Sequence, residues 1–213
     1  MDKTKLVELI NNPKPIILDI GSYNCRDALQ FDALFNKQAT IFAFEADPRS
    51  CELCRKAIVG TDIILLEGAI GNIDGECTFN IADAYIQDYH CSGSLNKPHN
   101  HLKFFPGVKF NGEVTVKCRR LDTWASTYLR NVEFVDLVWM DVNGAEESAI
   151  MGGSDTFLNR TKLIVTEFSN HELYLGQINK QRMLELLPGF DVIEEEYHAH
   201  GFGDIVLKNS RFQ

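Results

Sequence analysis

The sequence predicts an α/β protein in which helices cover both faces of a mostly parallel sheet. Short apolar runs alternate with longer helical stretches along most of the chain, which is the pattern of βαβ units. The apolar runs are almost uninterrupted, as expected for strands that are buried on both sides. The 213 residues are 45% apolar and can form one substantial core, so we expect a single domain over residues 1–213.

The predicted strands are rich in β-branched residues and lie at residues 16–20, 40–45, 62–66, 135–140 and 163–168. Two further segments, 191–194 and 204–207, are expected to pair as an antiparallel ending of the sheet.

The predicted helices follow these strands at residues 26–35, from 48 onward, 121–129, 145–151 and 180–187. Asp47 and Pro48 are expected to open the second of them, because proline fits the first turn of a helix.

The alternation breaks between residues 77 and 120, where β-like pieces at 77–81 and 114–118 enclose a long polar and aromatic segment. Connections longer than about 12 to 15 residues are usually functional lids or disordered segments. Because apolar and aromatic residues accompany the polar ones, we favour an ordered lid over the substrate, with a linker as the alternative.

Charge and composition exclude several classes of protein. The net charge of −9 and the pI near 5.1 argue against a nucleic-acid partner. No apolar run has the length of a signal peptide or a bilayer span, so we expect a cytoplasmic protein without a membrane span. The six cysteines form no dense framework, and the pair Cys51 and Cys54 lacks the second pair of a zinc site, so buried thiols are favoured over metal binding or redox function.

Acidic residues and glycines gather where the predicted parallel strands end, which is where ligands bind in open α/β sheets. After the first strand, Gly21 permits a close approach of the backbone to a ligand, with Asp19 and Ser22 beside it. The G-x-G-x-x-G fingerprint of a dinucleotide site is absent, which argues against a nicotinamide-dependent oxidoreductase.

The later strand ends continue this pattern. Glu45 follows Gly21 by 24 residues, the spacing at which a carboxylate accepts both hydroxyls of a ribose, although a charge at a helix N-terminus explains it equally well. Gly68 and Ala69 follow the third strand, where an adenine would lie or where the strand simply turns. The polar cluster 141–146 follows the fourth strand and favours a functional site.

These segments resemble the FkbM family of methyltransferases over roughly residues 17–168. The motifs that carry the resemblance are Leu18-Asp19-Ile20-Gly21, Phe42-Ala43-Phe44-Glu45-Ala46-Asp47-Pro48, Gly68-Ala69-Ile70-Gly71-Asn72, Arg120-Leu121-Asp122-Thr123-Trp124 and Asp141-Val142-Asn143-Gly144-Ala145-Glu146. The resemblance implies a class I methyltransferase fold with a Rossmann-like seven-stranded sheet and S-adenosylmethionine as the donor. It also implies methylation of a hydroxyl on a sugar, a glycan or a related small molecule.

The expected roles follow from the resemblance together with the strand ends. The cofactor-binding residues are expected to be Asp19, Gly21, Ser22, Glu45, Ala46, Gly68, Ala69 and Asp141. Asp141 is the first candidate for the catalytic base, or for the ligand of a divalent metal that acidifies the hydroxyl. Glu167 and His171 form the second candidate group.

The acceptor is expected to contact the lid through His90, Ser92, Ser94 and Lys97, together with Asn143. The histidines of the lid also leave metal binding open as an alternative. The sequence departs from the family pattern at two positions, with Cys25 in place of a second glycine and Asn143 in place of glutamate. A non-catalytic cofactor-binding or scaffold protein with the same fold is therefore the alternative function.

Overall fold

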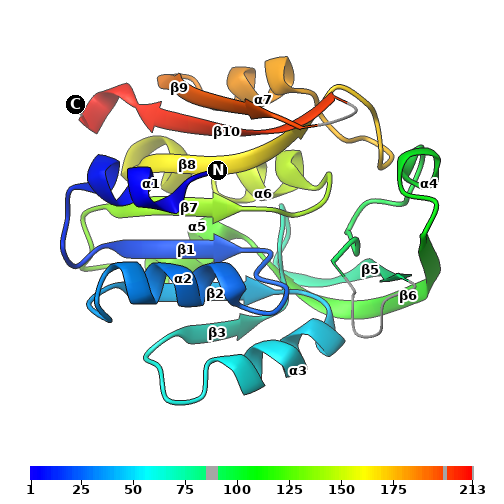
Figure 1. Ribbon diagram of the computed structural model, residues 1–213, viewed down its shortest axis with the longest axis horizontal. Coiled ribbons are helices and arrows are strands. Elements are labelled where there is room, and N and C mark those ends of the chain that lie inside the picture. The colour runs from blue at the N-terminus through cyan, green and yellow to red at the C-terminus, as the bar shows by residue number, and fades with distance from the viewer. Residues whose placement is uncertain (85–90, 199–200, 213) are drawn as a thin grey trace.

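The computed structural model describes residues 1–84, 91–198 and 201–212, and its centre is a seven-stranded sheet (Figure 1). The strands are β1 (Ile16–Ile20), β2 (Thr40–Glu45), β3 (Ile64–Glu67), β7 (Val135–Met140), β8 (Thr161–Ser169), β9 (Phe190–Tyr197) and β10 (Phe202–Asn209). Their order is β3-β2-β1-β7-β8-β10-β9. The first five of these are parallel, and β10 runs antiparallel to both of its neighbours. The predicted α/β class and the antiparallel ending are therefore confirmed.

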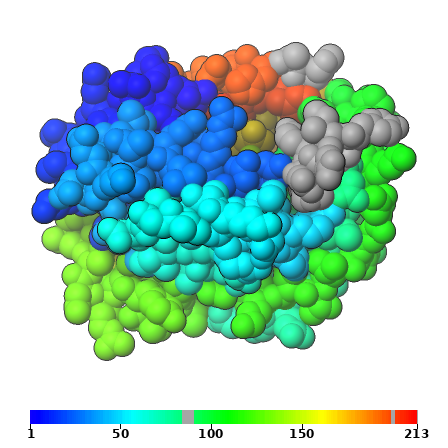
Figure 2. All heavy atoms as spheres, turned by 60° about the horizontal axis from the view of Figure 1, so that its bottom comes forward, coloured from blue at the N-terminus to red at the C-terminus, as the bar shows by residue number. Residues whose placement is uncertain are grey.

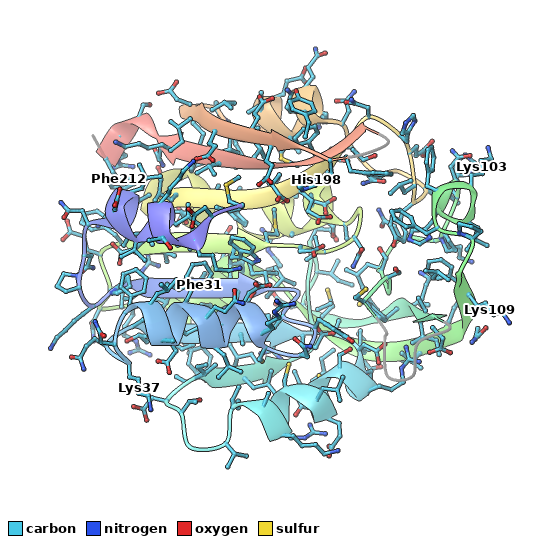
Figure 3. The ribbon with its side chains drawn as sticks, in the orientation of Figure 1. Phe31, Lys37, Lys103, Lys109, His198 and Phe212 are labelled. Carbon is cyan, nitrogen blue, oxygen red and sulfur yellow. The ribbon has the colours of Figure 1, made fainter. Side chains whose placement is uncertain are left out.

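Helices cover both faces of the sheet, as the sequence predicts. One face carries α1 (Lys3–Ile10), α2 (Arg26–Leu34) and α3 (Pro48–Ala57), and the other carries α5 (Leu121–Tyr128), α6 (Glu146–Gly152) and α7 (Lys180–Leu186). Phe31 extends from α2 to the sheet, where its ring centroid lies 5.5 Å from that of Trp139 (Figure 3). On the opposite face, Phe44 meets Trp124 at 5.0 Å. A π-helical turn, Thr156–Arg160, precedes β8, and a 3-10 turn, Ser210–Phe212, follows β10.

The helices α1, α3 and α7 begin at residues whose side chains accept hydrogen bonds from free backbone N–H groups. Asp47 accepts the Arg49 N–H at 2.9 Å and Pro48 stands in the first turn, which confirms the predicted start of α3. The patterns above do not predict α1. Its sequence pattern is short, because only Leu6 and Ile10 are buried along it. Asp2 caps the helix by accepting the Thr4 N–H at 2.9 Å.

The segment after β3 forms an insertion that lies beyond the carboxyl ends of the parallel strands (Figure 1). It contains β4 (Ala69–Ile70), β5 (Gly75–Ala84), α4 (His101–Phe104) and β6 (Val108–Arg119), with its three strands in the order β4-β6-β5. The predicted β-like pieces 77–81 and 114–118 lie inside β5 and β6, which extend further because they pair with each other from Gly75 with Cys118 to Ala84 with Val108.

The insertion forms one end of the molecule, where it appears in green beside the blue and cyan segments from α2 to β3 (Figure 2). Lys103 and Lys109 mark its outer edge (Figure 3). In the described ranges, no helix is long and apolar enough to cross a membrane.

Candidate active site

A cavity of about 440 Å³ lies where the carboxyl ends of β1, β2, β3 and β7 meet the insertion. Its lining includes most of the residues that the sequence predicts as cofactor-binding: Gly21, Ser22, Glu45, Ala46, Gly68, Ala69 and Asp141. The insertion contributes Phe79, Cys91, Gly93 and Leu95 to the same lining. The fold thus brings residues from distant parts of the sequence to one hollow.

Gly21 joins the end of β1 to the end of β7 by a contact that only glycine permits. Its φ is +90°, and a Cβ added to it would lie 1.7 Å from the carbonyl oxygen of Asp141. The N–H groups of Gly21 and Ser22 both donate to the carbonyl of Phe44, at 2.9 and 3.0 Å. The loop after β1 is therefore fixed against both neighbouring strands.

Asp19 is not among the residues that line the cavity. Its side chain is buried, and its backbone carbonyl accepts the Ser22 hydroxyl at 2.9 Å. Its Oδ2 atom has no hydrogen-bond partner among the described residues, and burial raises the pKa of its carboxyl to about 7. The structure therefore places Asp19 beneath the loop that lines the cavity.

Glu45 both lines the cavity and holds the loop after β1. One carboxylate oxygen accepts the Tyr23 N–H at 2.6 Å, and the other accepts the Asp47 N–H at 2.7 Å. Burial raises the pKa of Glu45 to about 8, against the opposing effect of these two hydrogen bonds. Each oxygen retains a second lone pair, so the carboxylate can still accept hydrogen bonds from a ligand.

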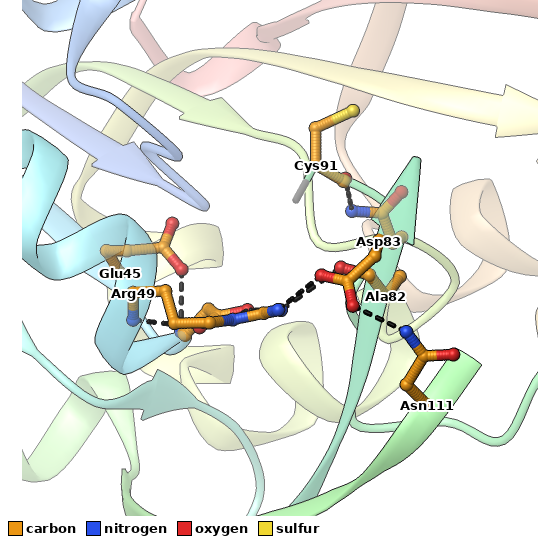
Figure 4. Close-up of polar contacts among 8 residues, drawn as sticks. Glu45, Arg49, Ala82, Asp83, Cys91 and Asn111 are labelled. Atoms are coloured by element: carbon orange, nitrogen blue, oxygen red, sulfur yellow. Dashed lines mark hydrogen bonds and ion pairs between the residues drawn. The ribbon is translucent and has the colours of Figure 1, made fainter. Parts of the chain in front are cut away.

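Arg49 on α3 connects the helix to β5 of the insertion (Figure 4). The sequence patterns do not identify this residue. Its guanidinium binds Asp47 on one side, with Nη2 at 2.5 Å from Oδ2, and Asp83 of β5 on the other. Nη2 also donates to the carbonyl of Ala82 at 3.1 Å, and Asp83 accepts the Asn111 side-chain amide. From the sequence alone, an arginine in the first turn of a predicted helix is expected to be a surface charge. The sequence does not reveal the tertiary contacts that form this bridge.

Asp141 stands at the end of β7 with its Oδ1 atom buried and without a partner among the described residues. Burial raises the pKa of its carboxyl to about 6, and the negative charges of Asp204 and Asp27 add to the increase. Glu167 lies on the adjacent strand, one residue beyond the paired residues Met140 and Thr166.

Asp204 pairs with Glu167 across the antiparallel strands β8 and β10, so three carboxylates stand side by side at this edge of the sheet. Glu167 is exposed and does not line the cavity. The negative charge of Asp141, with that of Asp204 beside it, raises the pKa of Glu167 well above its ordinary value.

The remaining predicted site residues do not all converge. The ring of His171 stacks on Phe104 with centroids 4.6 Å apart and does not line the cavity. Lys97 is exposed, and its Nζ pairs with Glu113 Oε1 at 3.4 Å. His90 lies outside the described residues.

Ser94 requires a correction, because its side chain is fully buried and donates to the Asn143 carbonyl at 2.7 Å. It is an internal link and not an exposed acceptor contact. Ser92 does not line the cavity, and its carbonyl accepts the Tyr174 hydroxyl at 2.9 Å. Asn143 does line the cavity, but its Nδ2 donates to the Cys91 carbonyl at 2.8 Å.

The cavity also contains residues that the sequence patterns do not single out. These are Lys3, Tyr23, Asn24, Arg26, Asp27, Gln30 and Ser50, besides the insertion residues named above. The remaining lining residues belong to the motifs that carry the family resemblance: Ile20, Phe44, Asp47, Ile70, Val142 and Ala145. Lys3 reaches the cavity on α1 and binds Asp27 at 2.6 Å. The capping residue Asp2 and the apolar spacing after it are the signals that identify α1 and so bring Lys3 into view.

No described His, Cys, Asp or Glu side chains form a group of three or more that could hold a metal ion. Cys51 and Cys54 are buried on α3, which confirms the predicted buried thiols at this pair. Cys25 and Cys118 are buried as well.

The buried carboxyls give an expected dependence of stability on pH. Burial raises the pKa values of Asp19, Glu45 and Glu146 to about 7, 8 and 7, whereas they ionise near pH 4 in an unfolded chain. Between about pH 4 and 8 the folded protein therefore holds protons that the unfolded chain has lost, and its free energy of unfolding falls as pH rises.

Urea unfolding of the ligand-free protein is expected to give a free energy of unfolding more than about 1 kcal/mol larger at pH 5 than at pH 8, since one unit of pKa corresponds to about 1.4 kcal/mol. The variant Glu45→Gln should show a smaller difference. Equal stability at both pH values would contradict the assignment of these carboxyls as buried and protonated.

Comparison with known proteins identifies the family. The sequence matches the methyltransferase FkbM domain over residues 19–202. It is 39% identical over 210 residues to the 2-O-methyltransferase NoeI of Sinorhizobium fredii (strain NBRC 101917 / NGR234), an alignment that covers 97% of this chain and 84% of that protein.

Solved structures share the fold at low sequence identity. The methyltransferase FkbM of Methylobacillus flagellatus KT superposes with a TM-score of 0.59 and 10% identity over 92% of this chain, which spans 44% of that longer chain. The fibrillarin of Aeropyrum pernix, solved with natively bound S-adenosyl-L-methionine, gives a TM-score of 0.51 and 12% identity over 96% of this chain and 74% of its own. The expected class I methyltransferase fold is therefore confirmed, and the chain belongs to the FkbM family of S-adenosylmethionine-dependent methyltransferases.

Proposed function

We propose that this protein transfers a methyl group from S-adenosylmethionine to a hydroxyl oxygen of a sugar, a glycan or a related small molecule. The observation that carries the proposal is the cavity that joins the ends of β1, β2 and β3 to Asp141 at the end of β7. The 39% identity to a protein named as a 2-O-methyltransferase supports oxygen as the atom that is methylated.

The residues around the cavity suit an adenosyl donor. Glu45 offers acceptor lone pairs for ribose hydroxyls, and Gly68 and Ala69 leave room for a flat base. Asp141 lines the cavity and carries a buried carboxylate oxygen without a partner among the described residues, which suits a ligand with a sulfonium group. When bound, this donor supplies an electrophilic methyl group on sulfur.

Asp141 is our candidate for the base that accepts the hydroxyl proton as the C–O bond forms and the C–S bond breaks. An alcohol is a weak nucleophile until its proton leaves, and a positioned base contributes roughly 10²- to 10⁴-fold to the rate. With its pKa near 6, Asp141 is largely ionised at neutral pH and can take up that proton. Glu167 on the adjacent strand and His171 are the second candidates, and a divalent metal on Asp141 is an alternative that a chelator would test.

Removing the Glu45 carboxylate is expected to weaken binding of S-adenosylhomocysteine. Glu45→Ala should cost about 1 to 3 kcal/mol of binding free energy, the range for leaving a buried hydrogen-bonding group without its partner, and calorimetry measures it. Glu45→Gln is the matched control for size, because it keeps one acceptor oxygen but turns an NH₂ group toward Tyr23 or Asp47 N–H. Unchanged affinity in Glu45→Ala would refute the ribose assignment.

Transfer of a labelled methyl group from S-adenosylmethionine to a panel of mono- and oligosaccharides tests the proposal. We expect labelled product with some members of the panel, and mass spectrometry of fragments should place the methyl group on oxygen. Tight binding of S-adenosylhomocysteine without transfer to sugars, lipids, polyketides or amides would favour the non-catalytic alternative.

A further inference from the structure

The loop after β7 has a backbone shape that turns two carbonyl groups toward the insertion. Asn143 and Gly144 have φ values of +51° and +87°, in the left-handed region. The Asn143 carbonyl accepts the Ser94 hydroxyl at 2.7 Å, and the Gly144 carbonyl accepts the Asn96 side-chain amide at 2.7 Å. The insertion thus holds the backbone of the loop only two residues after Asp141.

The Asn143 side chain makes the reciprocal contact. Its Nδ2 donates to the Cys91 carbonyl at 2.8 Å. This hydrogen bond requires an amide at position 143, because a carboxylate has no N–H group to donate. Tyr174 closes the group, because its hydroxyl donates to the Ser92 carbonyl at 2.9 Å and lies 3.5 Å from Asn143 Oδ1. We refer to Ser94, Asn96, Asn143 and Tyr174 as the polar clasp.

Tyr174 is buried at the centre of the clasp and is fixed by packing as well. Its side chain is 1% exposed, and a Cβ on Gly144 would lie 2.9 Å from its ring. Its ring centroid lies 5.2 Å from that of His101 in α4. The segment that carries Tyr174 is also bonded to the insertion through backbone groups, with His99 N–H donating to the Leu173 carbonyl at 2.7 Å and Leu175 N–H to the Lys97 carbonyl at 2.8 Å.

The segment 91–96 contacts both the cavity and the clasp. Cys91, Gly93 and Leu95 line the cavity. Between them, the Ser92 carbonyl and the Ser94 and Asn96 side chains make the clasp contacts. Ser94 also pairs with Asn80 of β5 as an isolated antiparallel bridge, which joins the segment to the sheet of the insertion. The clasp therefore sets the position of one cavity wall relative to Asp141.

We propose that Tyr174 and Asn143 are positioning residues for methyl transfer, and that they hold the cavity wall 91–95 and the loop that carries Asp141 in one arrangement. The inference rests on the proposed function, because the wall faces the acceptor only if Asp141 meets the acceptor hydroxyl. Reaction rates respond steeply to such placement, and a displacement of about 1 Å costs about 100-fold.

The kinetic test uses Tyr174→Phe, which removes one hydroxyl, and Asn143→Asp, which keeps the size of the side chain and removes its donor. We expect kcat to fall about 10- to 100-fold and the acceptor KM to rise, while the Kd for S-adenosylhomocysteine stays within about threefold. The pH profile of Asn143→Asp separates loss of the donor from a change in the pKa of Asp141. Tyr128→Phe on α5, where the tyrosine is 64% exposed, is the matched control and should behave as the wild type.

Hydrogen exchange tests the clasp without any acceptor. In both variants, peptides that contain residues 91–96 and 141–144 are expected to exchange faster, while peptides from β7 and β1 exchange as in the wild type. Unchanged exchange in these peptides would overturn the inference, and so would faster exchange with unaltered kcat and KM. A wild-type protein that transfers no methyl group would instead refute the proposed function, and the exchange data would still decide whether the clasp exists.

Discussion

Asp141→Asn is expected to lower kcat by about 10²- to 10⁴-fold while the affinity for S-adenosylhomocysteine remains nearly intact. The amide keeps the size of the side chain but cannot accept the hydroxyl proton. Its backbone contacts should persist, since the carbonyl that crowds Gly21 and the N–H that donates to Ile20 at 2.9 Å belong to the main chain. Single-turnover transfer of labelled methyl measures the loss, and calorimetry measures cofactor binding.

The pH dependence supplies an independent check on the same residue. Because burial raises the pKa of Asp141 to about 6, the ionised base becomes more abundant as pH rises, and kcat/KM for the acceptor should increase through an apparent pKa near 6. The variant should lose this rise, while the exposed carboxylate variant Asp191→Asn should retain it. Full activity in Asp141→Asn would assign the base to another group, of which Glu167 is the nearest candidate along the sheet.

Gly21→Ala is expected to destabilise the fold and abolish tight cofactor binding. Alanine at φ +90° costs about 1 to 2 kcal/mol, and a Cβ at 1.7 Å from the Asp141 carbonyl oxygen adds a steric cost of about 1 to 3 kcal/mol. The ends of β1 and β7 must separate to relieve this contact, which widens the cavity between them. Urea unfolding and calorimetry with S-adenosylhomocysteine measure the two effects.

Gly60 offers a matched control for the backbone part of that cost. It has a similar φ of +80°, and a Cβ added there meets no atom within 4 Å. Gly60→Ala should therefore lose only the conformational part of the stability and bind S-adenosylhomocysteine as the wild type does. Equal losses of stability and of S-adenosylhomocysteine affinity in the two variants would show that the contact between Gly21 and Asp141 does not cause the effect of Gly21→Ala.

The sheet is predictable from the sequence because burial on both faces produces continuous apolar runs that end in turn residues. The strands Ile16–Ile20, Thr40–Glu45 and Val135–Met140 have the bounds that the pattern predicts. The short helix His101–Phe104 and the full extent of the β5–β6 hairpin are not predictable in this way. The bounds of β5 and β6 depend on pairing between residues far apart in the sequence, and the start of α4 is held by hydrogen bonds from the His99 and His101 N–H groups to the Leu173 carbonyl.

The site is predictable only where a residue's role follows from its place at a strand end. Gly21, Glu45 and Asp141 meet in the cavity because parallel strands end at the same edge of a sheet. Ser94 is misplaced because a serine in a polar loop gives no sign that its hydroxyl is buried against a carbonyl 49 residues away. The sequence does not identify Tyr174 for the same reason, because its partners Ser92 and Asn143 lie 82 and 31 residues away along the chain.

The hydrogen bonds behind the cavity wall constrain which of the residues 91–96 can be changed without moving the wall. Deleting or adding one residue would displace the Ser94 hydroxyl from the Asn143 carbonyl and the Asn96 amide from the Gly144 carbonyl. At Gly93, a methyl group would lie 2.6 Å from the ring of Phe79, so enlargement is blocked there. Library mutagenesis of this stretch should thus concentrate on Cys91 and Leu95, whose side chains can change in volume without breaking the hydrogen bonds behind them.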